Sequence, residues 1–452
     1  MTTKSQAKNQ AWLAAHPEIK SLRIAASDLN GLPRGKRIPA SQAGKAFGGD
    51  LRMPLSTLNV DIWGEDIEES PLLFDSGDAD GSVIPTERGL VPMTWFATPS
   101  ALLPLWMFND RGQPFSGDPR HALKAVLERF AEQGLTPVVA TELEFHLLDG
   151  KAPEPTPPIS PLTGQTVTSR DVLSINGLDA FDEFFTDLYD ACEAMGLPAD
   201  AAISESGLGQ FEINLLHTDD AMKAADDTWL FKLAVRGVAR KHGFAASFMA
   251  KPYADEAGNG MHTHFSVLDE SGTNIFDDGT AQGSDRLRHA VGGCLKAMRA
   301  STLVFAPHFN SYRRMAPNSH APTAVSWGYE NRTAAVRIPG GKPKSRRIEH
   351  RVSGGDANPY LMLAVVLGAA LVGMDDAIEP PAPVSGNTYD ADLPRLPMKW
   401  SDAVDLFEGD PMIARIFHEN LIRNYVMCKR QEITGFINQP RLFEFTTYME
   451  TV

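Results

Sequence analysis

The first part of the chain carries short apolar stretches separated by clusters of Gly, Pro and Asp. SLRIAA, LVPMTWF and ALLPLWMF all lie between residues 20 and 110. Apolar runs of this length, bounded by turn-forming residues, predict β-strands. We therefore expect a small β-rich domain at residues 1–112, followed by a larger domain at residues 113–452.

The larger domain opens with a helical pattern at residues 118–133. Asp118 can cap this helix, Pro119 suits its first position, and the apolar residues that follow recur on one face. Strand-like and helix-like segments then alternate, which predicts an α+β or α/β class. The longest apolar run, residues 360–374, is shorter than the roughly 20 residues that cross a bilayer, so we expect a buried helix and no membrane partner. Further helices are expected near residues 400–430.

The net charge narrows the classes of partner. The 452 residues include 42 Lys and Arg against 57 Asp and Glu, for a formal charge of −15. Because a strongly negative protein repels polyanions, we expect no nucleic acid partner. The three cysteines are too far apart for a Cys-x-x-Cys motif, and the first residues lack an apolar secretory segment. We therefore expect a cytoplasmic protein.

Two predicted strands carry carboxylates inside apolar sequence. In TPVVATELEFHLLD, Glu142, Glu144 and His146 share one face, because side chains alternate along a strand. In SESGLGQFEINLL, Glu212 lies between apolar residues, and Glu205 precedes it across a glycine-rich turn. One such strand alone would be interpreted as a solvated face.

Two further strands add histidines and a third source of carboxylate. In GNGMHTHFSV, His262, His264 and Ser266 share a face. In SRRIEHRVSGG, Glu349 lies between two arginines. A lone histidine is usually structural, but four strands with ligand-type side chains make solvated faces a poor explanation. Oxygen and nitrogen ligands without thiolates predict Mg²⁺ or Mn²⁺.

Basic residues concentrate at residues 313–351 of this acidic chain. They are Arg313, Arg314, Arg332, Arg337, Lys342, Lys344, Arg346, Arg347 and Arg351. Guanidinium groups bind carboxylates and phosphates, so the segment predicts a phosphate ester or nucleotide ligand; a solvated basic loop is the alternative. The chain has neither a P-loop nor a Gly-x-Gly-x-x-Gly fingerprint, so a nucleotide would bind in another way.

The order and spacing of several motifs resemble the glutamine synthetase superfamily. These motifs are ELEF, ESGLGQFEINL, GNGMHTHFS, NSYRRMAP, NRTAAVRIP and RRIEHRVSGGDANPYL. The N-terminal SDLNGLPRGKRIP resembles the small β-grasp domain of that family. The resemblance implies an α+β fold in which this domain precedes a catalytic domain with a curved antiparallel sheet flanked by helices. It also implies a dodecamer of two hexameric rings, with active sites between subunits.

The resemblance further implies a site for ATP, L-glutamate and two to three Mg²⁺ or Mn²⁺ ions. One ion would bind Glu144, Glu205 and Glu212, and another Glu142, His262 and Glu349. Arg314 and Arg351 would bind glutamate, with Gly258 beside them. Arg332, Arg337 and Arg347 would hold the transferring phosphoryl group, and His264, Ser266 and Lys344 would line the nucleotide side, to which Arg337 and Arg347 also belong.

Two segments depart from the ammonia-using pattern of this family. MAPNSHAP has His320 where the family's flap glutamate would stand, and STLNVDIWG offers Asp61 beside Trp63 in place of the usual N-terminal motif. An aromatic ring suits the carbon chain or the cation of an alkylamine. The departures resemble the γ-glutamylpolyamine and γ-glutamylmonoamine synthetase branch.

The sequence therefore predicts an ATP-dependent ligase that joins the γ-carboxylate of L-glutamate to an organic amine through γ-glutamyl phosphate. The amine would be a polyamine such as putrescine or a small monoamine. The alternatives are an ammonia-using glutamine synthetase and, from a different class, a catalytically silent structural or regulatory homologue.

Overall fold

The computed structural model describes residues 3–73, 75–317, 319–439, 447 and 449. Its first six strands form one sheet in the order β2-β1-β6-β4-β3, with β5 paired to β6. β1 and β6 are parallel, and the other pairs are antiparallel. The strands are β1 Ser21–Ser27, β2 Pro33–Pro39, β3 Arg52–Pro54, β4 Asp80–Pro85, β5 Val91–Pro92 and β6 Ser100–Phe108. The helices of this part are α1 Thr3–Ala15 and α2 Ala43–Gly48, with short 3₁₀ turns at Ala40–Gln42 and Leu55–Leu58.

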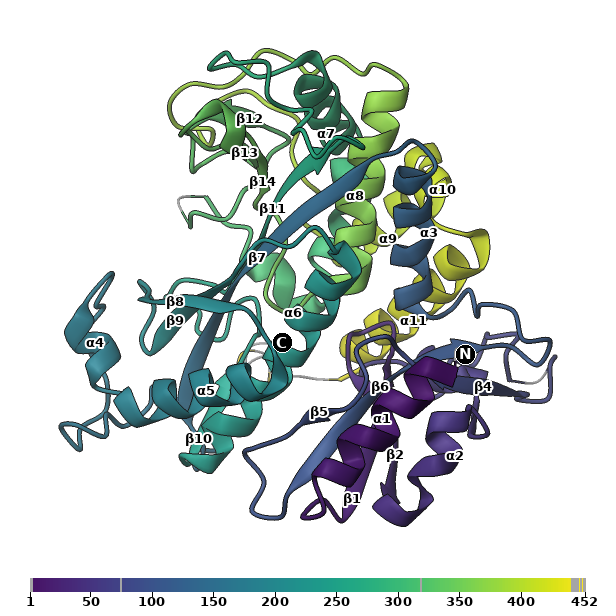
Figure 1. The fold of residues 1–452 in the computed structure, drawn as a ribbon. Helices are drawn as coiled ribbons and strands as arrows, with labels where there is room; N and C mark the ends of the chain where they lie inside the picture. The colour runs from purple at the N-terminus through teal and green to yellow at the C-terminus, as the bar shows by residue number, and fades with distance from the viewer. Residues whose placement is uncertain (1–2, 74, 318, 440–446, 448, 450–452) are drawn as a thin grey trace.

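The second sheet has eight strands in the order β12-β13-β14-β11-β7-β9-β8, with β10 paired to β7. All its pairs are antiparallel except β12 with β13. The strands are β7 Thr136–Asp149, β8 Ala199–Ser204, β9 Gln210–Leu215, β10 Phe244–Ser247, β11 Met261–Leu268, β12 Trp327–Tyr329, β13 Val336–Ile338 and β14 Ile348–His350. The long β7 runs diagonally through the molecule and joins the two halves of this sheet (Figure 1).

Helices pack against β7 and make up most of the C-terminal part of the chain (Figure 1). They are α3 Pro119–Ala131, α4 Ile175–Asp179, α5 Asp182–Met195, α6 Ala221–Lys241, α7 Asp285–Phe305, α8 Pro359–Asp375, α9 Trp400–Gly409, α10 Pro411–Ile416 and α11 Glu419–Ile437. Short 3₁₀ turns lie at Phe309–Arg313 and Pro343–Ser345. This mixture of antiparallel sheet and packed helices confirms the predicted α+β class.

The local signals predicted from the sequence produce the expected elements. The Asp118 side chain accepts a hydrogen bond from the backbone of the first turn of α3, and Pro119 is the first residue of that helix. Asn358 caps α8 in the same way. The β-rich N-terminal part and the C-terminal helices are also confirmed, whereas the domain boundary at 112/113 stays a prediction.

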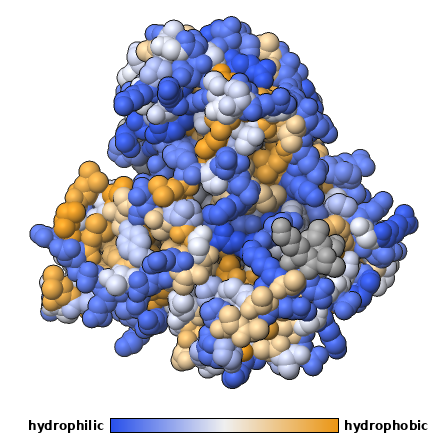
Figure 2. Space-filling view, in the orientation of Figure 1, coloured by the Kyte–Doolittle hydropathy of each residue, from blue (hydrophilic) through white to orange (hydrophobic). Residues whose placement is uncertain are grey.

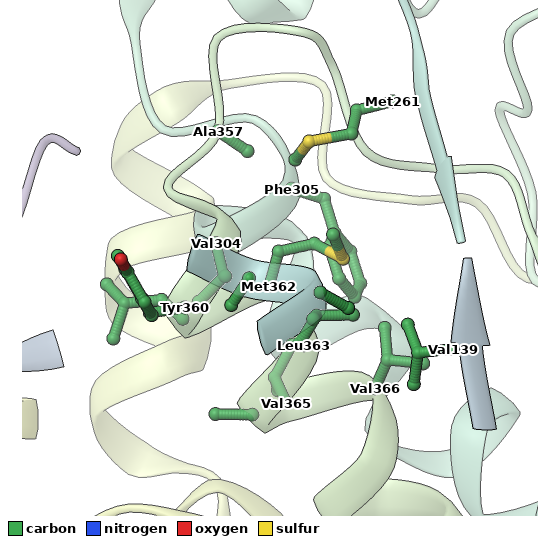
Figure 3. Close-up of a cluster of buried hydrophobic side chains, with 14 of the residues drawn as sticks. Val139, Met261, Val304, Phe305, Ala357, Tyr360, Met362, Leu363, Val365 and Val366 are labelled. Atoms are coloured by element: carbon green, nitrogen blue, oxygen red, sulfur yellow. The ribbon is translucent and has the colours of Figure 1, made fainter. Parts of the chain in front are cut away.

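Helix α8 is the centre of the larger core because it is apolar on every side. Residues 359–374 are all buried, and Figure 3 shows Met362 and Val366 of α8 among Phe305 of α7 and Val139 of β7. Helices α7 and α8 cross closely at glycines: a Cβ on Gly293 would lie 2.1 Å from a carbonyl oxygen of α8. In the described part of the chain, no helix is long and apolar enough to cross a bilayer.

The N-terminal sheet contributes to two cores. One face forms its own cluster, which includes Leu22, Leu103 and Met107. Residues of the other face, such as Leu102, join the larger core. Because the two parts share buried surface, their relative position is fixed by packing as well as by the chain connection.

Figure 2 shows apolar surface on the lobe that carries α4, at the left of the view. The side chains of Leu162, Leu173 and Ile175 are 67–73% exposed there. Apolar side chains gathered on a protein surface often mark contacts with other chains.

A buried ion pair joins α3 to α6. Arg120 donates from Nε and Nη2 to the Asp226 carboxylate at 2.9 and 2.8 Å, and the Tyr360 hydroxyl of α8 donates to the same carboxylate at 2.7 Å. The Arg120 guanidinium also lies 3.7 Å from the ring centre of Trp106 on β6. Three helices, α3, α6 and α8, and strand β6 of the first sheet therefore meet at one charge pair.

We predict that Asp226→Ala lowers the free energy of unfolding by about 3–5 kcal/mol, because it removes the buried partner of the Arg120 guanidinium and leaves only the exposed Glu87, at 3.6 Å. Tyr360→Phe should cost about 1.5–3 kcal/mol, since it removes one hydrogen bond to a charged group. Equilibrium urea unfolding measures both. Lys124→Ala, in an exposed pair with Glu128, is the control and should change stability by less than about 1 kcal/mol. Equal losses for Asp226→Ala and Lys124→Ala would contradict the assignment.

Candidate functional site

The register of the second sheet aligns the predicted ligand residues across neighbouring strands. Glu144 of β7 lies opposite Glu212 of β9, and Glu142 of β7 lies opposite His262 of β11. The alternation that places Glu142 and Glu144 on one face of β7 leaves Leu143 in the core. Three strands thus present carboxylates and an imidazole to one face of the sheet.

The row continues across β11, β14 and β13. His264 lies opposite Glu349, and Glu349 lies opposite Arg337. Strand β14 is only three residues long, so Arg347 and Arg351 flank it. Five strands in all therefore deliver side chains to one site.

Two groups of side chains have the spacing of a metal site. Glu142, His264 and Glu349 form one group, and Glu142, Glu212 and His262 form the other; within each group the ligand atoms lie within 4.8 Å of one another. Glu142 belongs to both groups because His262 Nδ1 and His264 Nε2 contact its two oxygens at 3.2 and 2.8 Å. These oxygen and nitrogen ligands suit a hard divalent cation.

The structure divides the predicted ligands differently from the sequence. His264, which we expected on the nucleotide side, groups with Glu142 and Glu349. Glu144 accepts a hydrogen bond from the backbone N–H of Gly260 at 2.6 Å and lies beside Glu212 by register. Which residue binds which ion therefore stays a prediction.

Among the described residues, the Glu205 and Glu212 carboxylates on the β9 side form no direct ion pair, and the charges of Arg332 and Arg351 only partly offset their burial. Burial, together with the negative charges of neighbouring Glu144 and Glu142, raises the pKa of Glu212 to about 9. Burial and the charge of Glu144 likewise raise the pKa of Glu205 to about 7. A site with this excess of buried negative charge would bind a cation favourably.

Glu142 and Glu349 have nearby partners that favour their ionised forms. Burial opposes ionisation of Glu142, but hydrogen bonds with His262 and His264 outweigh it and lower the pKa. Burial also opposes ionisation of Glu349, and the charge of Arg351 outweighs it and lowers the pKa there. The site is therefore polarised, with uncompensated carboxylates at one end and arginines at the other.

Three of the predicted arginines, Arg337, Arg347 and Arg351, lie at that second end. Arg337 donates to Glu349 at 2.8 Å, and Arg351 donates to the other oxygen of Glu349. Arg347 Nε donates to His264 Nδ1 at 3.1 Å. The charge of Arg332, an exposed residue, acts on Glu205 and lowers its pKa against the larger effects of burial and Glu144.

Arg314 lies in the wall of the site behind Gly258. Its side chain is 5% exposed and donates to the carbonyl oxygen of Val352 at 2.8 Å. A Cβ on Gly258 would lie 2.9 Å from the Arg314 side chain. Glycine is therefore required for this close approach.

Two of the predicted nucleotide-side residues, Ser266 and Lys344, are more exposed than the third, His264, which is buried. Ser266 is half-buried on β11, and Lys344 is exposed in the 3₁₀ turn before β14. The metal candidates on β7, β9, β11 and β14, with Arg337 and Ser266, therefore lie on one sheet, whereas Lys344 lies on a turn beside it.

His320 lies on a loop next to Arg314. It is exposed with a φ of 58°, and the preceding Ser319 hydroxyl donates to the carbonyl oxygen of Arg314 at 3.0 Å. The Tyr389 hydroxyl donates to the carbonyl oxygen of Ala321 at 2.8 Å. Sequence analysis missed Tyr389, because an isolated tyrosine in an irregular segment has no periodic signal.

Asp61 and Trp63 lie away from the sheet. The Asp61 carboxylate is buried and accepts hydrogen bonds from the backbone N–H of Trp63 and from Gln431 of α11, at 3.0 and 2.9 Å. The Trp63 ring is half exposed and lies 5.3 Å from that of Phe436. Within one chain, these two residues belong to the N-terminal domain's contact with α11.

Comparisons with known proteins identify the family of the chain. Residues 116–448 match the family model described as glutamine synthetase, catalytic domain. A γ-glutamylputrescine synthetase of Escherichia coli (strain K12) is 37% identical over 94% of this chain and 90% of its own length. A glutamine synthetase of Pyrococcus abyssi is 32% identical over 92% of this chain and 91% of its own length.

A solved structure described as a GmaS/ADP complex is similar over the whole fold. It covers 97% of this chain and 99% of its own, with a TM-score of 0.84 and 28% sequence identity. The family model covers the five strands that carry the ligand row, and the relatives cover nearly the full chain. The chain therefore belongs to the glutamine synthetase family of ATP-dependent ligases, as its motifs predicted.

Proposed function

We propose that this protein joins the γ-carboxylate of L-glutamate to an organic amine through γ-glutamyl phosphate. ATP phosphorylates the carboxylate and leaves as ADP, and the amine then displaces phosphate to give a γ-glutamylamide. The observation that carries the proposal is the row of Glu144, Glu212, Glu142, His262 and Glu349 across adjacent strands, with arginines at one end. Similarity to a γ-glutamylputrescine synthetase supports an organic amine as the acceptor.

The side chains present fit the divalent ions that the family uses. Two groups of side chains offer oxygen and nitrogen ligands, and within each group the ligand atoms lie within 4.8 Å of one another. The raised pKa values of Glu205 and Glu212 reflect crowded negative charge that a cation would balance. We propose two to three Mg²⁺ or Mn²⁺ ions per site, held by these carboxylates and His262. Bound ions would supply Lewis-acid stabilisation of the phosphoryl oxygens.

The arginines are proposed to stabilise the negative charges of the substrates and of the transferring phosphoryl group. A carboxylate is a poor acyl donor until it is phosphorylated. While the phosphoryl group passes from ATP to the carboxylate, negative charge spreads over the phosphoryl oxygens. Arg332, Arg337 and Arg347 are proposed to neutralise that charge, and Arg314 and Arg351 to orient the glutamate carboxylates. Arg337 and Arg351 are already preorganised by their bonds to Glu349.

An amine must lose a proton before it attacks the acyl phosphate. His320 is exposed beside Arg314 and is proposed to cover the amine site in place of a flap carboxylate. A cavity of about 750 Å³ beside α11 is lined by Asp61, Trp63, Glu65 and further acidic residues. We propose that it faces the site of a neighbouring subunit and attracts the cationic amine.

This arrangement requires an assembly, which we propose to be a cytoplasmic dodecamer of two hexameric rings. The exposed apolar side chains of Leu162, Leu173 and Ile175 are suited to a contact between chains. An ammonia-using glutamine synthetase is the second candidate, supported by the similarity to the P. abyssi enzyme.

We predict that an organic amine exceeds ammonia in kcat/KM by at least about 10-fold, because each buried methylene contributes about 0.8 kcal/mol. The measurement is Mg²⁺-ATP-dependent phosphate release with L-glutamate and ammonia, ethylamine, isopropylamine, ethanolamine, putrescine or spermidine, with mass detection of the product. Preference for ammonia would establish the glutamine synthetase alternative. Absence of turnover with every amine would favour a silent homologue.

We also predict opposite effects of Glu212→Gln on stability and on metal binding. Removing one of several crowded carboxylates should raise the Tm of the metal-free protein at pH 8. The same change should weaken Mn²⁺ binding by more than about 10-fold, since it removes a proposed ligand. Differential scanning calorimetry and Mn²⁺ titration followed by electron paramagnetic resonance measure the two effects.

Glu193→Gln is the matched control for Glu212→Gln, because Glu193 is exposed on α5. It should leave both the Tm and Mn²⁺ affinity unchanged. Unchanged Mn²⁺ affinity in Glu212→Gln would show that this carboxylate is not a ligand.

A further inference from the structure

Three buried, uncharged side chains lie directly behind Glu144. They are His146 of β7, Gln210 at the start of β9 and Asn259 just before β11, and each is at most 2% exposed. His146 and Gln210 are opposite each other in the register of β7 and β9. Three separate segments of the chain therefore meet at this point.

Asn259 is held in one orientation by backbone groups. Its Nδ2 donates to the carbonyl oxygens of Ser247 and Met249 at 3.2 and 2.8 Å. Because these partners can only accept, Oδ1 must face the other way. It contacts His146 Nδ1 at 2.9 Å and accepts from Gln210 Nε2 at 3.2 Å. His146 must then donate from Nδ1.

Gln210 is oriented in turn by a backbone donor. Its Oε1 accepts from the N–H of Gly207 at 2.9 Å, so Nε2 points toward the site. There Nε2 contacts the carbonyl oxygen of Gly258 at 3.0 Å and Glu144 Oε2 at 3.4 Å. Gly207 lies in the turn that follows Glu205, between β8 and β9. One amide thus connects Glu144, Gly258 and the turn that follows Glu205.

We propose that Gln210 is a positioning residue for the ligase reaction. Its amide sets the distances among Glu144, Glu205 and Gly258. The inference rests on the proposed function, in which the two carboxylates hold a metal ion and Arg314, which lies behind Gly258, orients glutamate. Loss of the amide would remove the hydrogen bonds that Gln210 makes to the Gly258 carbonyl oxygen and the Gly207 N–H, and one of the two hydrogen bonds each of Asn259 Oδ1 and Glu144 Oε2. The surrounding groups would shift to regain hydrogen bonds.

The geometry predicts that a change at Gln210 affects the binding of L-glutamate and the binding of ATP differently. The hydrogen bonds of Gln210 among the described residues reach the Glu144 and Gly258 side of the site. Glu142 is held separately by His262 and His264. A change at Gln210 should therefore affect glutamate and the metal beside it more than ATP.

The test is Gln210→Met, which keeps the length of the side chain and removes its donor and acceptor. We expect the KM for L-glutamate to rise about 10- to 100-fold, while the KM for ATP changes less than about 3-fold. Mn²⁺ affinity, measured by electron paramagnetic resonance in the absence of substrates, should fall by a similar 10-fold or more. Gln210→Glu, which turns an oxygen toward Gly258 and Glu144, should show the same split.

Thr141→Val is the matched control. Thr141 is buried on the same strand as Glu144, but its hydroxyl is paired with that of Thr228 on α6 at 2.9 Å, behind the sheet. It should lower the Tm to an extent comparable with Gln210→Met and leave the KM for glutamate and Mn²⁺ affinity unchanged. A purely structural role of Gln210 would make the two variants alike.

Unchanged Mn²⁺ affinity and glutamate KM in Gln210→Met would overturn the proposal. Equal rises in the KM values for glutamate and ATP would overturn it too. If the wild-type protein forms no γ-glutamylamide with any amine, the proposed function fails, but the Mn²⁺ comparison still tests whether Gln210 positions the carboxylates.

Discussion

The central constraint on this structure is that several carboxylates, all of which can carry negative charge, are gathered around strand β7. Glu142 and Glu144 of β7, Glu212 of β9 and Glu349 of β14 meet on a single face of the sheet. Carboxylates so close together repel one another, and taking them out of water adds a further cost. The fold offsets part of this cost with histidines and arginines at the β14 end. The remainder, at the β9 end, is negative charge that a bound cation would balance.

The rest of the fold holds these charges in place. Behind β7, Leu143 and Phe145 pack into a core that is centred on the fully apolar helix α8. A close-packed core transmits little movement, so it keeps the strand register and hence the spacing of the ligands. The N-terminal domain is tied to this core through Asn358, whose amide donates to the carbonyl oxygens of Asp28 and Leu29 at 2.9 and 3.3 Å. Because the side chains of the site are held in place before the substrates bind, substrate-binding energy can be used to stabilise the transition state.

Much of this site could be predicted from the sequence, because strand alternation is a local property. It placed Glu142 with Glu144 and His262 with His264, and the motifs identified the family and the ligase chemistry that the comparisons confirm. Register is not local, so the contact of His264 with Glu142 could not be foreseen. Nor could the pairing of Asp61 with Gln431 of α11, which lies far along the chain. The amide network of Gln210 was missed because a lone glutamine in a strand has no distinctive pattern.

The central claim is that the row of carboxylates and histidines across β9, β7, β11 and β14 is a metal site. The most direct measurement is an anomalous difference map from crystals of the protein grown with Mn²⁺. The account predicts at least two peaks on this row, with oxygen and nitrogen ligands from Glu142, Glu212 and His262 among their contacts. A map with no peak on this face of the sheet at saturating Mn²⁺, or with peaks only elsewhere, would contradict it.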